Sequence, residues 1–555
     1  MNRNYVAITI GIISLGLFVF AAHFVAPQTD YRHARVTNEE YERIVSERKE
    51  SNNSMLHDLK FNDRKVYFAE KDNTWYYSIV EEDSNAYNPR IKTNGNHDLK
   101  IAFKNNQDID ESSIADANAL DFIVYDDAHY SSYKLAITTL PIIEITHEDE
   151  ISHDNDTGLK FELFDNRKNT TKRITQTVGD IHYRGRSSTN YDKKSYRLNL
   201  RYKSPGEHDR NANEPLLGMR EDDDWILYTP YNDSEKVRNV FSEQLWRAAD
   251  QDNAAIRGTT SFESRYVELI ENEQYYGLYV LMTTIDEKSL GLEKDKEGNY
   301  RNYIFKKESA WKLEDVLPGT KAVDTYEIKS KSIASEKEAW GKLRDYLYNS
   351  LTLRDTDYIR DHSEMNNLAD ISIFENLIQN TDAFTQDDSG DFSNFYLSNI
   401  DTHNGEQFIF APWDFDASWG RYYDSGDVTY EQYPDGMLTQ SYFVTGPLFE
   451  ENNNFKDELD ARYAELRTTN WSNDKIMELI DQNERDVYRS GAYLREKTAW
   501  PSANYIRDEE PQNLDHFRAF VKKRIEYMDY YYNYATNEPT PLEAEWVEPR
   551  NFDND

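Results

Sequence analysis

Three acids and one amide in the C-terminal half of the chain are of the types that a phosphate-transfer site needs. Asn394 begins the run Asn-Phe-Tyr-Leu, and Asp414 and Asp416 flank Phe415 directly after an apolar stretch. Mg²⁺ takes hard oxygen ligands, commonly one or two carboxylates together with substrate phosphates. A further carboxylate then receives the proton of the attacking hydroxyl, and Asp382 is available for that role. Turn residues or helix caps would use the same residue types, so both interpretations stay open.

A second segment, earlier in the chain, combines small residues with positive charge. The backbone N–H groups of a small-residue turn and the cations that follow it can surround phosphate groups. An ordinary surface hairpin with solvated basic side chains would have the same composition. The candidate nucleotide-binding residues of this segment are Arg184, Gly185, Ser187, Ser188, Lys193, Lys194 and Arg197.

Composition excludes several other chemistries. The chain has no cysteine, which rules out disulfides, cysteine nucleophiles, Fe–S clusters and cysteine-ligated zinc. A formal net charge of −38 repels nucleic-acid backbones, so we expect no nucleic-acid partner. The phosphate-loop, dinucleotide-binding, HExxH and GxSxG signatures are absent from the sequence. The acidic run 386–391 lacks the full EF-hand pattern, and a solvated loop is expected there.

The elements that must hold these residues change character along the chain. Short apolar or alternating runs from Lys65 to about residue 140, and again in GLKFELFD, GDIHYRGR and SYRLNLRY, are typical of strands. Residues 264–285 predict a hairpin that turns at Asn272-Glu273, and a helix is expected to begin near Asp233, capped by Asp233 or Ser234. Helical periodicity follows over 337–351, 365–380, 455–469, 473–490 and 514–535, and the second of these helices, strongly amphipathic, is expected to end beside Asp382. The pattern predicts an α+β fold.

Several blocks of the sequence, taken in their order along the chain, resemble the spore coat protein H (CotH) kinase family. The matching blocks are LPIIEITHEDEI, HYRGRSSTNYDKKSYRLNL, DDWILYTPYNDSEKVRN, YYGLYVL, YIFKK, NTDAF, SNFYL and APWDFDASWGR. The resemblance covers roughly residues 139–535. It implies a divergent, bilobal protein-kinase-like domain that transfers phosphate from ATP to Ser or Thr hydroxyls of a protein substrate, with Mg²⁺ or Mn²⁺.

The resemblance also implies roles for single residues. Asp382 matches the family's proposed catalytic Asp and Asp414 its metal-binding Asp. Asn394 stands where a second metal ligand is expected, and Asp416 is an extra ligand or an orienting group. Residues 184–188 would form the nucleotide-covering turn, with Lys194 or its neighbour Lys193 contacting phosphate. The sequence departs from the family at Thr283, where a Glu is often found, and Glu287 is a candidate to compensate.

The N-terminus predicts a membrane anchor. Residues 5–25 carry no Asp, Glu, Lys or Arg, and this length matches the roughly 20 residues that a helix needs to cross a bilayer. A cleaved signal peptide is the competing interpretation. With Arg3 in front of the apolar run, the rest of the chain is expected outside the cytoplasm. The predicted division is a transmembrane anchor (1–27), a stalk (28–60), a β-rich module (61–138), the CotH kinase-like domain (139–535) and an acidic tail (536–555).

Two other function classes remain beside the kinase. A non-catalytic surface protein could use the same scaffold, without catalysis, for adhesion or for envelope or coat assembly. A carbohydrate-binding or cell-wall hydrolase would suit the aromatic and acidic abundance, but no distinct acid pair for it is found in the sequence. Asp382, Asn394 and Asp414 favour the kinase, because a binding protein has no need of a metal constellation.

Overall fold

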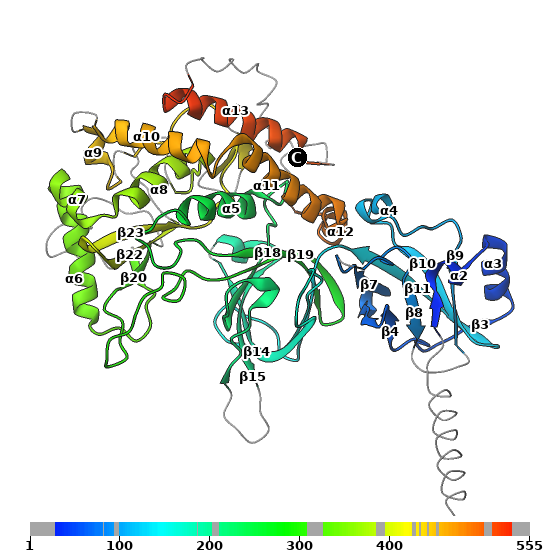
Figure 1. The fold of residues 1–555 in the computed structure, drawn as a ribbon. Helices are drawn as coiled ribbons and strands as arrows, with labels where there is room; N and C mark the ends of the chain where they lie inside the picture. The colour runs from blue at the N-terminus through cyan, green and yellow to red at the C-terminus, as the bar shows by residue number, and fades with distance from the viewer. Residues whose placement is uncertain are drawn as a thin grey trace, which may run out of the picture.

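The computed structural model describes most of the chain beyond its N-terminal segment. Three parts follow one another in Figure 1: a β-rich module, a closed sheet, and a lobe in which helices pack on a smaller sheet. The described residues are 28–81, 83–93, 99–185, 187–202, 210–307, 326–383, 394–423, 429–431, 434–440, 443–450, 454–503 and 513–535. The predicted acidic tail, the acidic run 386–391 and the predicted anchor lie outside them.

The first module packs two sheets around one apolar core. One sheet has the order β1-β8-β4-β5, and the other has the order β2-β9-β10-β11-β7-β6 with β3 paired to β11. Residues 28–60, expected to form a stalk, belong to this module instead, because Tyr31, Leu56 and Leu59 lie in its core. Its elements are β1 (Gln28–Asp30), α2 (Tyr31–Ala34), β2 (Arg35–Val36), α3 (Asn38–Ser46), β3 (Lys49–Glu50), β4 (Leu59–Phe61), β5 (Arg64–Lys65), β6 (Tyr67–Ala69), β7 (Thr74–Ser78), β8 (Arg90–Thr93), β9 (Lys100–Lys104), α4 (Glu111–Ala115), β10 (Leu120–Tyr125) and β11 (His129–Thr138).

The middle part is a sheet that closes on itself. Its order is β14-β13-β12-β18-β19-β17-β15-β16, and β14 pairs with β15 as well as with β13. Gly179 permits this close pairing, because a Cβ there would collide with the backbone of Asn199 on β15. Its strands are β12 (Ile142–His147), β13 (Thr157–Phe164), β14 (Ile174–Arg184), β15 (Ser195–Tyr202), β16 (Arg210–Asn211), β17 (Asp224–Tyr228), β18 (Ser264–Glu271) and β19 (Gln274–Met282).

The last part joins a small sheet to helices. The sheet has the order β21-β20-β22-β23, and β24 pairs with β25 nearby. One large core contains side chains from α5, α8, α10, α11 and α13 together with β20, β22 and β23. The elements are α5 (Arg238–Asp250), β20 (Ile304–Lys307), β21 (Tyr326–Ile328), α6 (Glu336–Leu347), α7 (Thr356–His362), α8 (Met365–Ile378), β22 (Phe395–Thr402), β23 (Gly405–Pro412), β24 (Arg421–Tyr423), β25 (Thr429–Glu431), α9 (Gly446–Glu450), α10 (Asn454–Thr468), α11 (Asn473–Glu484), α12 (Ala492–Ala499) and α13 (Asp515–Tyr531).

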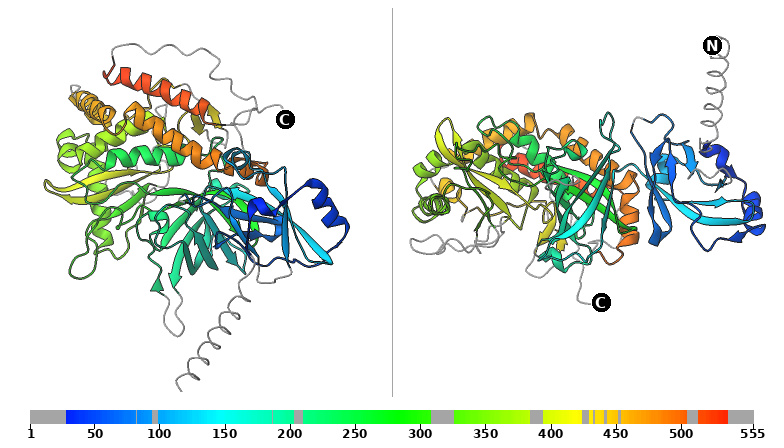
Figure 2. Two further views of the ribbon diagram at one scale, coloured as in Figure 1. Left: turned by 45° about the vertical axis from the view of Figure 1, so that its right-hand side comes forward. Right: turned by 90° about the horizontal axis from the view of Figure 1, so that it is seen from below.

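Most predicted elements are confirmed, with departures at α5 and α8, and several helices, α12 among them, were not predicted. The hairpin of β18 and β19 turns at Asn272-Glu273 as predicted. Helix α5 begins at Arg238 rather than near Asp233, although the Asp233 carboxylate does accept a hydrogen bond from the Arg238 N–H at 2.8 Å. The predicted amphipathic helix, α8, is buried on nearly every side instead. Helix α12 was not predicted, and it lies between the first module and the closed sheet (Figure 2, right).

The membrane prediction requires correction. A helix needs about 20 apolar residues to cross a bilayer, whereas α13, the longest helix of the described ranges, has 17 residues and a mixed polar sequence. Among the described residues, no helix is both long and apolar enough to span a membrane. Among the residues that the structure describes, the fold class is α+β with several sheets and no membrane-spanning helix, so the predicted single-pass membrane location is not supported.

Candidate active site

The loop after α8 is fixed from both sides before it reaches Asp382. Gln379 ends the helix in a left-handed conformation, and Arg524 of α13 donates to the carbonyl oxygens of Asn376 and Leu377. Cations suit the carbonyl end of a helix. Next, the Thr381 N–H donates to the Ala417 carbonyl at 3.1 Å. The position of Asp382 therefore depends on the 414–417 segment as well as on α8.

Asp414 follows β23 in a strained turn. Its φ of +66° is a conformation that Asp and Asn tolerate better than most residues. The preceding Trp413 N–H donates to the Asn394 carbonyl at 2.9 Å, and the following Phe415 N–H donates to the Asn239 side chain at 3.1 Å. These two contacts join β22, β23 and α5, so three elements distant in sequence hold the Asp414 turn.

The four predicted catalytic and metal-binding residues are brought together. The Asn394 amide donates to the Asp382 carboxylate. Burial raises the pKa of Asp382 to about 6, and the charge of Asp416 adds to this rise. Burial raises the pKa of Asp414 to about 8, with further contributions from Asp416 and Asp382. All three acids keep part of their surface exposed. The three carboxylates therefore act on one another's charge in a reachable place, which marks a candidate functional site.

Arg184 is the predicted cofactor-binding cation that the structure places nearest these acids. It ends β14, and its guanidinium lies 5.8 Å from the centre of the Trp413 ring. Burial lowers the pKa of Arg184, while Tyr396 and Asp414 oppose that change. The positive charges of Arg184 and of Lys306 on β20 both lower the pKa of Asp414. Two cations from different sheets therefore face the acid cluster.

The two lysines predicted to contact phosphate lie elsewhere. Lys193 is fully buried, and its Nζ pairs with Glu496 of α12 at 2.6 Å and donates to the Leu278 carbonyl at 2.7 Å. Lys194 donates to the carbonyl oxygens of Thr189 and Tyr191. Both ammonium groups are thus engaged within the protein. Arg184, which precedes them, instead lies close enough to Asp414 to lower its pKa.

Arg197 lies on β15, and the small residues of the turn lie between β14 and β15. Arg197 forms a two-pronged ion pair with Asp224 on the neighbouring strand β17. Gly185 has a φ of +107°, and a Cβ there would collide with the Ser188 hydroxyl, so the tight turn requires glycine. Ser187 lies in the same turn, but its side chain is outside the described atoms.

Several polar residues outside the predicted set of site residues belong to this region. The Asn232 amide donates to Asp416 at 2.7 Å, which leaves the other Asp416 oxygen open to a further partner. Tyr228 and Arg421 carry buried polar atoms without hydrogen-bond partners, and the charges of Asp416, Asp414 and Arg421 all act on Tyr228. The blocks that resemble the family contain all three of these residues, Asn232, Tyr228 and Arg421. Membership of such a block was therefore the sequence signal that could have identified them. Glu287, the candidate to replace the missing family Glu, instead accepts from the Lys331 N–H.

Across the described residues, no group of three or more His, Asp or Glu side chains has an arrangement that holds a metal ion by itself. That finding fits a site in which substrate oxygens complete the coordination, since Mg²⁺ commonly uses only one or two protein carboxylates. The orphaned Tyr228 hydroxyl and Arg421 nitrogens are consistent with a missing anionic ligand. The residues present therefore fit a nucleotide with a divalent cation.

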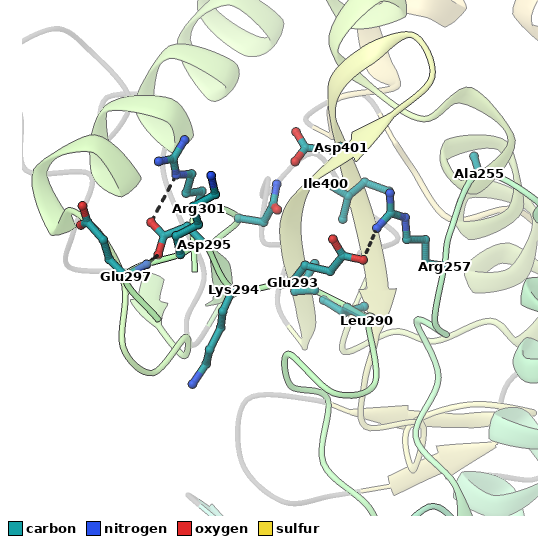
Figure 3. Close-up of a pocket in the computed structure, with 14 residues that line it drawn as sticks. Ala255, Arg257, Leu290, Glu293, Lys294, Asp295, Glu297, Arg301, Ile400 and Asp401 are labelled. Atoms are coloured by element: carbon teal, nitrogen blue, oxygen red, sulfur yellow. Dashed lines mark hydrogen bonds and ion pairs between the residues drawn. The ribbon is translucent and has the colours of Figure 1, made fainter. Parts of the chain in front are cut away.

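A separate cavity of about 570 Å³ lies away from the acid cluster (Figure 3). Its charged lining pairs internally, with Arg257 on Glu293 at 2.6 Å and Arg301 on Asp295 at 3.4 Å. None of the predicted site residues lines it. We therefore assign the candidate chemistry to the acid cluster and not to this cavity.

A strand-rich lobe, a helix-rich lobe, and an acid–amide–arginine cluster held between them define a kinase-like protein. Comparison with family models gives the same result: residues 181–528, more than half of the chain, match the family described as CotH kinase protein. The chain belongs to the CotH kinase family and is, at the level of that family, a kinase-like enzyme. No curated protein matches the chain.

One buried acid behind the cluster gives a stability prediction. Burial raises the pKa of Glu375 on α8 to about 8, and Asp382 adds to the rise. The Asn380 amide lies close enough to Glu375 to oppose this rise in pKa, but neither Glu375 oxygen has a partner in hydrogen-bonding geometry. Because the folded pKa lies above the unfolded one, stability falls as pH rises from about 4.5 to about 8. Glu375→Gln should remove about 2 kcal/mol or more of that loss.

Urea unfolding at pH 5 and pH 8.5 measures this effect. Glu478→Gln on the exposed face of α11 is the matched control. For this variant, the free energy of unfolding should change between the two pH values by the same amount as in wild type. An unchanged pH dependence in Glu375→Gln would show that this carboxyl group is not kept neutral by the fold.

Proposed function

We propose that this protein transfers the terminal phosphoryl group of ATP to Ser or Thr hydroxyl groups of a protein substrate. The observation that carries the proposal is the cluster of Asp382, Asn394, Asp414 and Asp416 beside Arg184. These residues come from β14, from the loop after α8, and from the positions just before β22 and just after β23. Membership of the CotH kinase family supports the same reaction class.

In this proposal Asp382 positions the acceptor hydroxyl and takes its proton. The hydroxyl oxygen forms the new bond to phosphorus, and the bond to the leaving diphosphate breaks. Asn394 holds the Asp382 carboxylate in place through its amide. Arg184 neutralises charge on the phosphates from the side of Trp413. Positioning and electrostatic stabilisation supply most of the catalysis in phosphoryl transfer.

Asp414, Asp416 and Asn394 would hold a divalent cation, Mg²⁺ or Mn²⁺. When bound, such an ion would offset the negative charge of the phosphate groups. Burial, together with the charges of Asp416 and Asp382, raises the pKa of Asp414 to about 8, and a cation that offsets those charges would suit such a cluster. Asn232 would orient Asp416 for that task through its 2.7 Å hydrogen bond.

Incubation with γ-labelled ATP tests the proposal. The purified chain is mixed with a panel of Ser- and Thr-rich acceptor proteins and either Mg²⁺ or Mn²⁺, and label on protein is measured. We expect metal-dependent labelling of protein that resists removal of free nucleotide. The matched control is Asp414→Asn, which keeps the shape and the backbone preference of that position while removing its charge.

Binding of ATP on the same samples separates the possible negative results. ATP binding without labelling of any acceptor or of the chain itself would contradict phosphoryl transfer and favour a non-catalytic role for the scaffold. Absence of both ATP binding and labelling would contradict the proposal that ATP is the phosphate donor.

A further inference from the structure

Arg421 is an unusual residue for its position in the fold. It stands at the start of β24, five residues after Asp416, and only 1% of it is exposed. Its Nε and Nη1 atoms are buried and have no hydrogen-bond partner. A buried guanidinium without partners is costly, because its donors lose water and gain nothing in return.

Other buried arginines of the described chain are well supplied with acceptors. Arg238 reaches Asp233, Glu235 and the Ser418 carbonyl. Arg495 forms a two-pronged pair with Glu268, and Arg524 donates to backbone carbonyls on two segments. The fold therefore provides partners where an arginine has only a structural task. Arg421 differs from them, which points to an acceptor that arrives from outside the protein.

A second orphaned donor identifies where that acceptor would lie. Tyr228 ends β17, and its hydroxyl is buried without a partner. Burial and the charges of Asp416 and Asp414 raise the pKa of Tyr228, whereas the charge of Arg421 lowers it. The Tyr228 hydroxyl is therefore within electrostatic reach of both the acid pair and Arg421. Unpartnered guanidinium and hydroxyl donors near a cluster of acids suit the oxygens of a phosphate group.

We propose that Arg421 and Tyr228 form a phosphate subsite on the Asp416 side of the acid cluster. The ligand class is a nucleoside di- or triphosphate, whose phosphate chain would reach from this subsite towards Arg184. The subsite rests on the proposed function for its biological ligand. It adds a second arginine to phosphate recognition, supplied by the helix-rich lobe, whereas Arg184 comes from the closed sheet.

Calorimetric titration of the whole chain with ATP, ADP, adenosine and inorganic tripolyphosphate, all with Mg²⁺, tests the subsite. Arg421→Gln should weaken ATP, ADP and tripolyphosphate by about 10- to 100-fold, the range for a hydrogen bond to a charged group, and leave adenosine unchanged. Tyr228→Phe should weaken the same three ligands by about 3- to 10-fold. Arg257→Gln is the matched control, since Arg257 pairs with Glu293 in the separate cavity of Figure 3.

The melting temperature of the ligand-free variants separates binding from structure. Arg421→Gln removes an unpartnered buried charge, so its melting temperature should equal or exceed that of wild type. A marked fall in melting temperature, or unchanged affinity for ATP and tripolyphosphate, would overturn the subsite. Equal loss of adenosine and ATP would do the same, because it would show that phosphate is not what Arg421 recognises.

The ligand series also keeps the two proposals apart. If wild type binds ATP and Arg421→Gln binds it equally well, the subsite fails while the proposed function stands. If wild type binds tripolyphosphate through Arg421 but gains nothing from the nucleoside and transfers no label, the subsite stands and ATP as donor fails. Binding of neither ATP nor tripolyphosphate by wild type overturns both.

Discussion

Asp414→Asn and Asp382→Asn are each expected to lower phosphoryl transfer by about 1,000-fold or more without loss of the fold. Removal of Asp414 takes away a charge that would hold the metal ion, and removal of Asp382 takes away the proton acceptor. Contributions of this size are ordinary for groups that act on developing charge. Initial rates of label transfer, measured at saturating metal, give the effect.

The same variants should stabilise the ligand-free protein, which is the more specific part of the prediction. Burial and neighbouring acids raise the pKa of Asp414 to about 8 and that of Asp382 to about 6. A raised carboxyl pKa means that stability falls as pH rises from the unfolded value near 3.8 to the folded value. Asparagine does not ionise, so the gain in melting temperature should be larger at pH 8.5 than at pH 5.

Asp401→Asn is the control for both measurements. Asp401 lies on the exposed end of β22, beside the separate cavity, so this substitution should change neither transfer nor the pH dependence of stability. Retained transfer in Asp414→Asn or Asp382→Asn would refute the assigned roles. A melting temperature that falls in both variants would show that these carboxylates stabilise the fold instead.

Lys193→Met is expected to destabilise the protein by about 3–5 kcal/mol, the usual cost of removing one partner of a buried ion pair. Lys193 and Glu496 are both fully buried and pair at 2.6 Å, and Glu496 also accepts from the Leu278 N–H at 2.8 Å. Without the ammonium group, the Glu496 charge would be left in the interior. Urea unfolding with the slope held in common gives the free-energy difference.

Two further variants test whether the buried ion pair causes this loss of stability. Lys194→Met should cost about 1 kcal/mol or less, because its ammonium donates only to two carbonyl oxygens near a partly exposed surface. The double variant Lys193→Met with Glu496→Leu should recover much of the stability, since it removes both charges together. If Lys193→Met keeps its stability but loses affinity for ATP, the lysine contacts phosphate after all.

The comparison of Lys193 with Arg184 shows why the sequence alone could not decide which of the proposed cations lies beside the acid cluster. All three basic residues, Arg184, Lys193 and Lys194, stand within one short segment. Their side-chain directions depend on where β14 ends and on what covers β15. Glu496 is 303 positions beyond Lys193 in the chain, on α12, a helix that the periodicity analysis did not predict. Nothing local to the segment indicates that partner.

Residue types and their order along the chain determined the α+β class, most strands and helices, the family and the acids of the candidate site. Those features follow from local patterns, namely side-chain periodicity, turn residues and the succession of family-like blocks. The tertiary structure decided the closure of the sheet, the packing of residues 28–60 into the first module, the pairing of Lys193 with Glu496, and the burial of Arg421 and Tyr228 without partners. Each of these depends on contacts between residues far apart in the chain, and burial and pairing are properties of such contacts rather than of any sequence window.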